Sequence, residues 1–293
     1  MKPFLTVALL AIAFSSYAQQ YYSFSQYMYN PLAINPAFAG YYQVPEATFS
    51  ARSQLSGIDG AGSSVALTGH GKGPGQNTGL GALASNDRIG VSNVTSFQGV
   101  YSYQLVSKNK NSYTSWGYVP EMLSFGLSAG VTRYYENLTS LNIDNDPNFA
   151  ANVNRFLPTF GFGVFYSKDP FYIGASIPQL MNNFGADNIN LNRHIFLNSG
   201  VHLETSAFTK LHLNTLVKYV YGAPAQADFN AVMTFHDTFK FGLGYRTVSL
   251  VNFMTGLDIS KSFRMAYFYD IPLGTSRNIA FSIHEIMINY RFF

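Results

Sequence analysis

Bulky apolar residues alternate with small or polar residues along most of the chain, in segments of about ten residues separated by turn residues. In residues 122–132, for example, Leu123 and Phe125 share one face, whereas Ser124 and Gly126 share the other. Successive side chains of a β-strand point to opposite faces, so this period of two predicts strands with one apolar face.

About fourteen segments follow this rule, although the first alternates only weakly, and an even number in this range is typical of bacterial outer-membrane barrels. The segments are 47–54, 63–70, 78–86, 94–105, 122–132, 160–166, 171–177, 194–204, 210–218, 227–236, 239–246, 251–258, 263–270 and 283–293. A soluble β-sandwich alternates as well. The long series, with bulky residues on one face and Gly, Ser or charges on the other, favours a membrane barrel.

The segment 239–246 shows what this assignment predicts for single side chains. Leu243 and its aromatic neighbours two positions away, Phe241 and Tyr245, are expected to face lipid, whereas Lys240 and Arg246 are expected to face the lumen. Replacing a lipid-facing residue with Arg costs about 2–4 kcal/mol at the membrane midplane. We therefore expect Leu243→Arg to impair folding, and Gly244→Ser, on the lumen face, to be mild.

The connections between segments differ in length in a regular way. The long ones are 135–156, 178–192, 219–226 and 271–280, and the short ones are 168–169, 205–209, 237–238 and 259–262. Outer-membrane barrels have long extracellular loops and short periplasmic turns, so this order predicts that both termini are periplasmic. Residues 106–121, which carry the single Trp116, are an exception. Either they form a periplasmic contact loop or the strands near them are misassigned.

The stretch before the first strand reads differently. Residues 25–40, S-Q-Y-M-Y-N-P-L-A-I-N-P-A-F-A-G, contain two Asn-Pro pairs, Asn30-Pro31 and Asn35-Pro36. Proline has no amide hydrogen to donate and pushes the residue before it toward extended geometry. Neither a regular helix nor a membrane strand is expected here.

The same stretch, which we call the N-terminal segment (residues 25–40), is also rich in apolar side chains. They include Tyr27, Tyr29 and Phe38, and the segment closes with Gly40. One interpretation is a proline-rich lead-in to the first strand. We predict instead that the segment packs in the barrel lumen or at its periplasmic mouth, since a closed barrel buries such side chains only there. A segment in that place blocks diffusion, so poor ion conduction is expected, and its aromatic residues are available to a periplasmic partner.

The start of the chain indicates export. A short basic start precedes the apolar core 4–14, and Ser16-Tyr17-Ala18 has the spacing of a cleavage site. This pattern predicts a secretory signal peptide over residues 1–18. A membrane-spanning helix needs about 20 apolar residues, so an anchor is disfavoured here.

Composition agrees with a membrane barrel. Hydrophobic residues make up 47% of the chain, aromatic residues 16% and charged residues only 11%, whereas soluble domains carry about 25% charged residues. Closing a sheet into a barrel satisfies every backbone amide without water. The chain contains no Cys, which removes disulfides and thiol chemistry. We predict an all-β transmembrane antiparallel barrel over 47–293, preceded by the N-terminal part 19–46.

Groups that carry catalysis or hold metals do not gather in this sequence. His194 and His202 share a face of one predicted strand, but at this spacing they lie about 26 Å apart. Gly79 and Gly81 do not form a nucleotide-binding loop, because no helix follows them. The net charge of +3 is too small to indicate nucleic acid. We therefore expect no catalytic residue, no metal, no cofactor and no nucleic-acid partner.

Charged residues on the predicted lumen face are the more informative set. They are Arg52, Lys240, Arg246, Asp258, Arg264, Asp270, Glu285 and Arg291. One interpretation is a salt-bridge network that only fills the lumen. The other is a polar surface that holds the N-terminal segment or a partner.

The pattern S-Q-Y-M-Y-N-P-x-x-x-N-P-A-F-A-G resembles the opening of the PorP/SprF family, outer-membrane proteins of the type IX secretion system. The resemblance continues through Arg52, Gln54 and Gly57, with Leu55 where the family pattern R-x-Q-W-x-G has Trp. It resumes at Gly79-Leu80-Gly81, Asp87-Arg88-Ile89-Gly90 and Ile283-His284-Glu285-Ile286, and so spans the mature chain.

The resemblance implies a function in binding and not in catalysis. It implies an outer-membrane protein of secreting and gliding bacteria that joins periplasmic ring proteins of the machine, or receives and anchors the C-terminal domain of a secreted adhesin or other cargo. The alternative is a porin or a transporter of hydrophobic compounds. An open lumen favours that alternative, and a filled lumen favours the secretion role.

Overall fold

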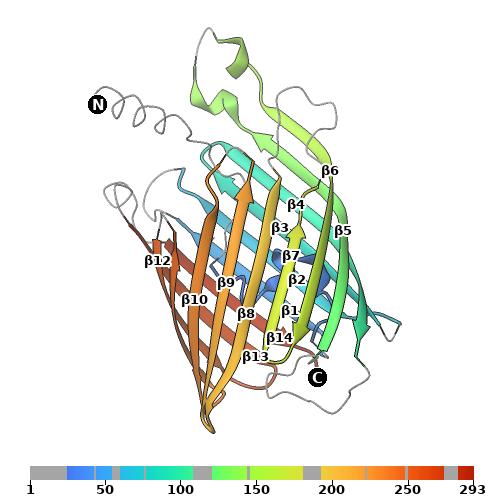
Figure 1. Cartoon of the computed structure of the whole chain (residues 1–293). Helices are drawn as coiled ribbons and strands as arrows, with labels where there is room; N and C mark the ends of the chain where they lie inside the picture. The colour runs from blue at the N-terminus through green and yellow to red at the C-terminus, as the bar shows by residue number, and fades with distance from the viewer. Residues whose placement is uncertain are drawn as a thin grey trace, which may run out of the picture.

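A single closed antiparallel barrel forms the body of the protein in this computed structural model (Figure 1). The structure describes residues 25–42, 44–54, 60–75, 77–107, 121–143, 146–180, 193–221, 223–247, 250–273 and 283–293. Each strand pairs with its neighbours in sequence, and β1 closes the barrel against β14. The strands within the described residues are β1 (Glu46–Ser53), β2 (Ser63–Lys72), β3 (Thr78–Ile89), β4 (Ser92–Val106), β5 (Glu121–Glu136), β6 (Val153–Lys168), β7 (Phe171–Ile177), β8 (His194–Ser206), β9 (Thr209–Val220), β10 (Gln226–Phe235), β11 (Phe239–Arg246), β12 (Leu250–Asp258), β13 (Phe263–Pro272) and β14 (Ile283–Arg291).

This architecture confirms the predicted fold class. Each predicted segment lies on one of these strands, and the fourteenth strand returns to the first. Closure gives each described strand a hydrogen-bonded neighbour on both sides, as a lipid environment requires. No helix within the described residues is both long enough and apolar enough to cross a membrane.

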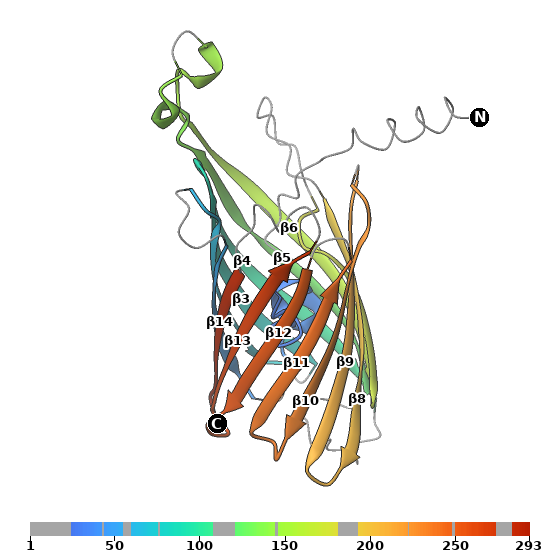
Figure 2. The same ribbon diagram turned by 90° about the vertical axis from the view of Figure 1, so that its left-hand side faces the viewer.

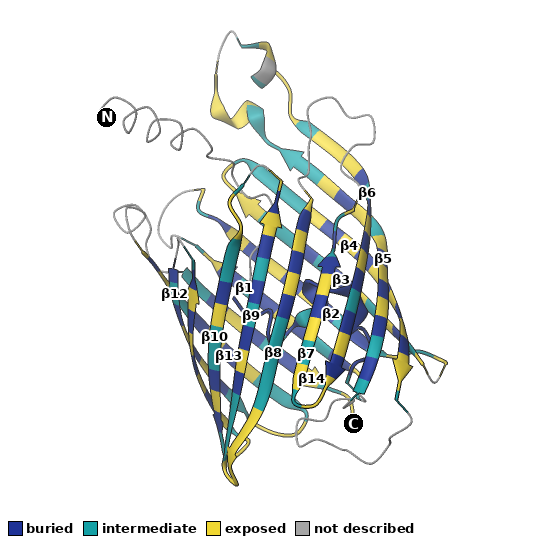
Figure 3. Ribbon diagram, viewed as in Figure 1, coloured by how far each residue is buried: buried dark blue, intermediate teal, exposed yellow. Residues whose placement is uncertain are grey.

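The two faces of the wall divide as the alternation predicts. Leu243 is 59% exposed on the outer face, whereas Lys240 and Arg246 on the same strand are each 6% exposed. Figure 3 shows this alternation of exposed and buried positions along the strands around the barrel. The exposed outer positions are largely Phe, Leu, Tyr, Ile and Val, which form the lipid-facing surface.

The barrel has two unlike ends. One end, which we call the C-terminal end, carries the start of β1, the last residue of β14 and the short turns β6–β7, β8–β9, β10–β11 and β12–β13. The other, the far end, carries the hairpin of β5 and β6, which projects well beyond the neighbouring strands (Figure 2). Two 3-10 helices, η3 (Leu138–Leu141) and η4 (Pro147–Phe149), lie in that hairpin. Residues 108–120 of the exceptional connection 106–121 lie outside the described residues.

The N-terminal segment lies inside the barrel and takes no part in the wall (Figures 1 and 2). It contains two short 3-10 helices, η1 (Pro31–Ala33) and η2 (Pro36–Phe38). The predicted signal peptide, residues 1–18, lies outside the described residues, which begin at Ser25.

Candidate binding site in the barrel lumen

The two Asn-Pro pairs give the N-terminal segment its shape. Pro31 opens η1 and Pro36 opens η2, where the missing amide hydrogen of proline is not needed. The side-chain oxygen of Asn35 accepts a hydrogen bond from the amide of Ala37 at 2.9 Å and so caps η2. Gly40 ends the segment with φ of +71°, a backbone conformation that favours glycine.

A buried ion cluster fixes the first described residue. The guanidinium of Arg52 lies 3.2 Å from Asp270 and 3.0 Å from Glu285, and these side chains are at most 3% exposed. Ser25 donates its amide hydrogen to Glu285 at 3.0 Å and its hydroxyl hydrogen to Asp270 at 2.7 Å. These carboxylates therefore hold the segment as well as pairing with Arg52 across the wall.

The position of this cluster shows toward which end of the barrel the N-terminal segment begins. Arg52 and Glu285 pair near the far end of β1 and β14, whereas Glu46 and Arg291 pair at the C-terminal end. Ser25 thus lies toward the far end, away from the last residues of the chain. Residues 1–24 lie outside the described residues, so the predicted periplasmic location of the N-terminus stays a prediction.

Aromatic and aliphatic side chains pack the middle of the segment against the wall. Tyr27 is 3% exposed, and its hydroxyl accepts a hydrogen bond from Asn230 of β10 at 2.6 Å. The ring of Tyr29 meets Phe268 of β13 edge-on at 6.2 Å and lies beneath the guanidinium of Arg264 at 5.7 Å. Together with Met28 and Ile34, Tyr27 joins an apolar cluster drawn from β8, β9, β10, β12, β13 and β14.

Wall hydroxyls and amides satisfy the carbonyl groups of the segment. Ser176 donates to the carbonyl of Ile34 at 2.6 Å, and Ser124 donates to that of Ala37 at 2.7 Å. The carbonyl of Ala39 accepts from Ser102 at 2.7 Å and from Gln104 at 2.9 Å. These bonds come from β4, β5 and β7, and the apolar cluster extends from β8, next to β7, round to β14. The segment therefore bridges the lumen from wall to wall.

Two wall glycines allow the backbone to approach closely. A Cβ at Gly126 would lie 2.1 Å from the amide nitrogen of Ala37, and a Cβ at Gly163 would lie 2.1 Å from the side-chain oxygen of Asn35. Real Cβ atoms do not reach such distances, so these positions accept the segment only because they carry no side chain.

Phe38 and His70 join the end of the segment to the start of the barrel. Phe38 is 3% exposed and packs edge-on against Phe165 at 5.3 Å. The amide of Gly40 donates to Nδ1 of His70 at 3.3 Å, and Nε2 of His70 lies 3.2 Å from Glu46. One ring nitrogen thus accepts from the segment while the other donates to the first residue of β1.

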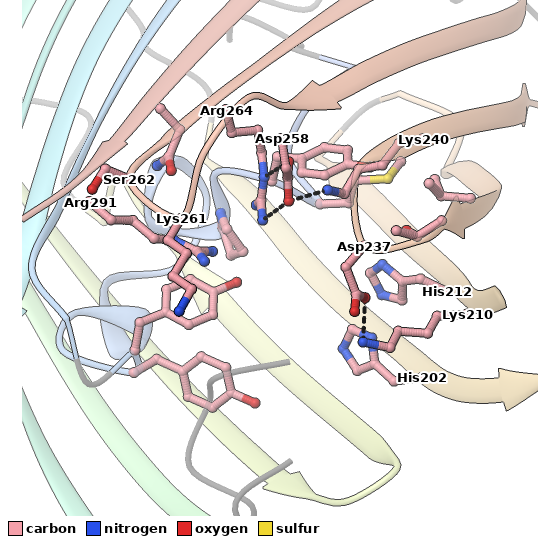
Figure 4. Close-up of a pocket in the computed structure, with 18 of the residues that line it drawn as sticks. His202, Lys210, His212, Asp237, Lys240, Asp258, Lys261, Ser262, Arg264 and Arg291 are labelled. Carbon is pink, nitrogen blue, oxygen red and sulfur yellow. Dashed lines mark hydrogen bonds and ion pairs between the residues drawn. The ribbon is translucent and has the colours of Figure 1, made fainter. Parts of the chain in front are cut away.

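A cavity of about 600 Å³ lies between the N-terminal segment and the C-terminal end (Figure 4). Tyr29, Phe38 and Tyr42 line it from the segment side, and residues of the β12–β13 turn line it from the other. Burial raises the pKa of the Tyr42 phenol to about 12, so this hydroxyl stays neutral at physiological pH. Among the described residues, no three His, Asp or Glu side chains lie close enough to hold a metal ion.

The charges that the sequence placed in the lumen form three further groups besides the Arg52 cluster. Asp228 is held by Arg246 at 2.8 Å and by Lys218 at 2.9 Å. Asp258 is shared by Lys240 at 2.5 Å and Arg264 at 2.7 Å. Glu46 pairs with Arg291 at 3.3 Å and with His70.

Sequence reasoning did not single out Asp228, Lys218, Glu46 or His70. For Asp228 and Lys218 the signal was present, because both fall on the inward positions of their alternating segments. Glu46 and His70 stand at the ends of their segments, where alternation carries little information.

Residues 16–290 match the model of a protein family described as "Type IX secretion system membrane protein PorP/SprF". The chain belongs to this family. It is thus an outer-membrane barrel and a membrane component of the type IX secretion system, as the motifs predicted. No curated protein matches the chain.

Solved structures share the fold of this PorP/SprF protein at low sequence identity. A mutant of the monoaromatic hydrocarbon channel TodX has a TM-score of 0.52 and 11% identity, over 94% of this chain and 96% of that one. The hydrocarbon channel CymD has a TM-score of 0.51 and 10% identity, over 94% and 95%. The outer membrane protein Omp33 of Acinetobacter baumannii has a TM-score of 0.50 and 7% identity, over 86% and 100%. These likenesses describe the barrel fold.

Proposed function

We propose that this PorP/SprF protein is a non-enzymatic binding component of the secretion machine whose lumen is closed by the N-terminal segment. The contact of that segment with opposite walls carries the proposal. It is fixed at Tyr27 by Asn230 of β10 and at Ala39 by Ser102 and Gln104 of β4, and β4 and β10 lie six strands apart around the barrel. The Arg52 cluster also holds Ser25. The stretch that bears the family motif is thus the stretch that fills the barrel.

The partners are periplasmic ring proteins of the machine, the C-terminal domain of a secreted adhesin or other cargo, or both. The C-terminal end faces the periplasm in this proposal, because long loops of outer-membrane barrels are extracellular and the β5–β6 hairpin stands at the far end. A ring protein would meet the short turns at the C-terminal end. Surface cargo, including an adhesin used in gliding, would meet the far end.

Single-channel recording tests whether the N-terminal segment closes the lumen. The intact mature protein should conduct poorly for its strand number, and a protein lacking residues 25–40 should fold and conduct more. A deletion within the β5–β6 hairpin, residues 138–149, is the matched control and should leave conductance low. A large, steady conductance from the intact protein would refute the plug and favour the porin or hydrophobic-compound transporter.

Affinity purification from the native membrane tests the partners. Ring proteins or a cargo C-terminal domain should co-purify with the intact protein, whereas an unrelated outer-membrane barrel purified in the same way should not retain them. The proposal is contradicted if these proteins fail to co-purify with the intact protein and a strain that lacks the protein still secretes normally.

A further inference from the structure

The cavity beneath the N-terminal segment has an aromatic lining. Tyr29, Phe38, Tyr41 and Tyr42 face it from the segment and the residues after it, and Tyr172 faces it from β7. Its volume of about 600 Å³ falls within the range of small-molecule sites, about 300–1,000 Å³. The cavity is therefore large enough for a ligand that stacks on rings.

Basic side chains outnumber acidic ones on the same lining. The basic ones are Lys210, Lys240, Lys261, Arg264 and Arg291, and the acidic ones are Asp237 and Asp258. Both carboxylates already have basic partners: Asp237 pairs with Lys210, and Asp258 pairs with Lys240 and Arg264. Arg291 is likewise paired, with Glu46, so the excess consists of Lys261 and one of the two cations at Asp258. An excess of positive charge in a partly enclosed pocket attracts an anion.

Three of these cations line the same cavity. Figure 4 shows Lys240 and Arg264 converging on Asp258, while Lys261 extends into the cavity from the β12–β13 turn. Within the described part of the chain, Lys261 makes no ion pair. The guanidinium of Arg291 lies 5.4 Å from the ring centre of Tyr42, so charge and aromatic surface are adjacent.

We propose that this cavity binds an organic carboxylate whose apolar or aromatic part lies against Tyr29, Tyr41 and Tyr42 while its charge meets Lys240, Lys261 and Arg264. Asp258 already accepts from Nε and one terminal nitrogen of Arg264, so a ligand carboxylate would meet the remaining donors of Arg264 and the ammonium groups of Lys240 and Lys261. The rings suit an aromatic or aliphatic group attached to that carboxylate. Two sources present this chemistry, a free small acid and the C-terminal residue of a polypeptide. The proposal does not depend on the secretion role, because it concerns the chemistry of the cavity alone.

Calorimetric titration of the purified mature protein with 3-phenylpropionate tests the site. The neutral analogue 3-phenylpropan-1-ol keeps the ring and loses the charge, and acetate keeps the charge and loses the ring. We expect 3-phenylpropionate to bind about tenfold more tightly than either, the scale of a hydrogen bond to a charged group. Equal binding of the acid and the alcohol would overturn the proposal.

Single lysine substitutions distinguish ligand binding in this cavity from binding to other basic parts of the surface. Lys240→Gln should weaken binding of 3-phenylpropionate about tenfold, and the exposed Lys261→Gln about threefold. Lys168→Gln is the control, since Lys168 is the last residue of β6 at the same end of the barrel, with its side chain 65% exposed. It should bind as the unmodified protein does. Because Lys261 lies in an exposed turn, its replacement leaves the barrel folded, and unchanged binding by Lys261→Gln and Lys240→Gln contradicts the assignment.

A peptide distinguishes the two sources. The tripeptide Ala-Ala-Phe with a free carboxylate is compared with its C-terminal amide. Binding of the free peptide alone supports the site and identifies chain ends as ligands. Binding of 3-phenylpropionate without the peptide supports the site for small acids, and binding of neither refutes it. Since conductance and partner purification are separate measurements, failure here leaves the proposed secretion role standing.

Discussion

Gly126 of β5 lies directly against the amide of Ala37, so closely that a Cβ on Gly126 would stand 2.1 Å from that nitrogen. Ala37 cannot easily move away, because its carbonyl oxygen accepts a hydrogen bond from Ser124, two residues before Gly126 on the same strand. The bare backbone at Gly126 is therefore a condition for the N-terminal segment to lie where it does.

Gly126→Ala should displace the N-terminal segment from β5. Overpacking of this kind costs about 1–3 kcal/mol, and the strain is relieved most simply by release of the segment. We expect higher single-channel conductance and an unchanged barrel. Gly256→Ala is the control, since a Cβ there would approach Lys240 Cβ only to 3.3 Å. Equal conductance of the two variants would show that the segment does not depend on this contact.

Leu243→Arg should impair folding into bilayers. Leu243 is 59% exposed on the lipid face in the middle of β11, and arginine there costs about 2–4 kcal/mol at the membrane midplane. Tyr221→Arg in the β9–β10 loop, at an 84% exposed position, should be close to neutral. Urea unfolding from lipid vesicles measures both. Comparable losses of stability in the two variants would mean that the apolar band of the barrel does not include Leu243.

Arg52→Gln should destabilise the protein by about 3–5 kcal/mol, the usual effect of removing one partner from a buried ion pair. It removes the guanidinium that pairs with the buried carboxylates of Asp270 and Glu285, and leaves them with the neutral donors Ser25, Gln26 and Asn252. The control Arg133→Gln removes an exposed arginine that bonds Asn154 at the far end. Its effect on unfolding in urea should be below about 1 kcal/mol. A small effect from Arg52→Gln would mean that the carboxylates find other partners.

Local pattern predicted most of the wall. The positions of Leu243, Lys240 and Arg246 follow from alternation alone, because a strand in a barrel wall must turn each successive side chain to lipid or to lumen. The non-strand character of the N-terminal segment likewise follows from Pro31 and Pro36, which have no amide hydrogen to donate to a ladder.

Contacts inside the lumen were not predictable in the same way. That Asn35 meets Gly163, or Ser25 meets Glu285, depends on how fourteen strands close and stagger, which no short stretch of sequence encodes. The expectation that Gly244→Ser is mild stays a prediction, and it now requires the side chain of Asn230 to shift. A Cβ at Gly244 would lie 2.2 Å from the side-chain oxygen of Asn230, so this lumen position is crowded by a neighbouring strand.

A pair of engineered cysteines should join the N-terminal segment to the inside of the wall. The side-chain oxygen of Asn30 accepts a hydrogen bond from the hydroxyl of Thr68 at 2.9 Å, and both residues are at most 3% exposed. The chain has no native Cys, so Asn30→Cys with Thr68→Cys creates a single possible pair. A short bis-methanethiosulfonate reagent should bridge the two in intact outer membranes, visible as a faster band on a non-reducing gel.

The control for this pair uses the other face of the same strand. Val65 of β2 is 42% exposed toward lipid, so Asn30→Cys with Val65→Cys should not be bridged, because the wall stands between the two thiols. Bridging of both pairs, or of the Val65 pair alone, would mean that the segment lies outside the lumen. The bridge between positions 30 and 68 is covalent. The bridged protein should therefore keep its low conductance under the conditions in which the Gly126→Ala variant releases its N-terminal segment. A rise in conductance with the bridge in place would show that something other than the N-terminal segment closes the barrel.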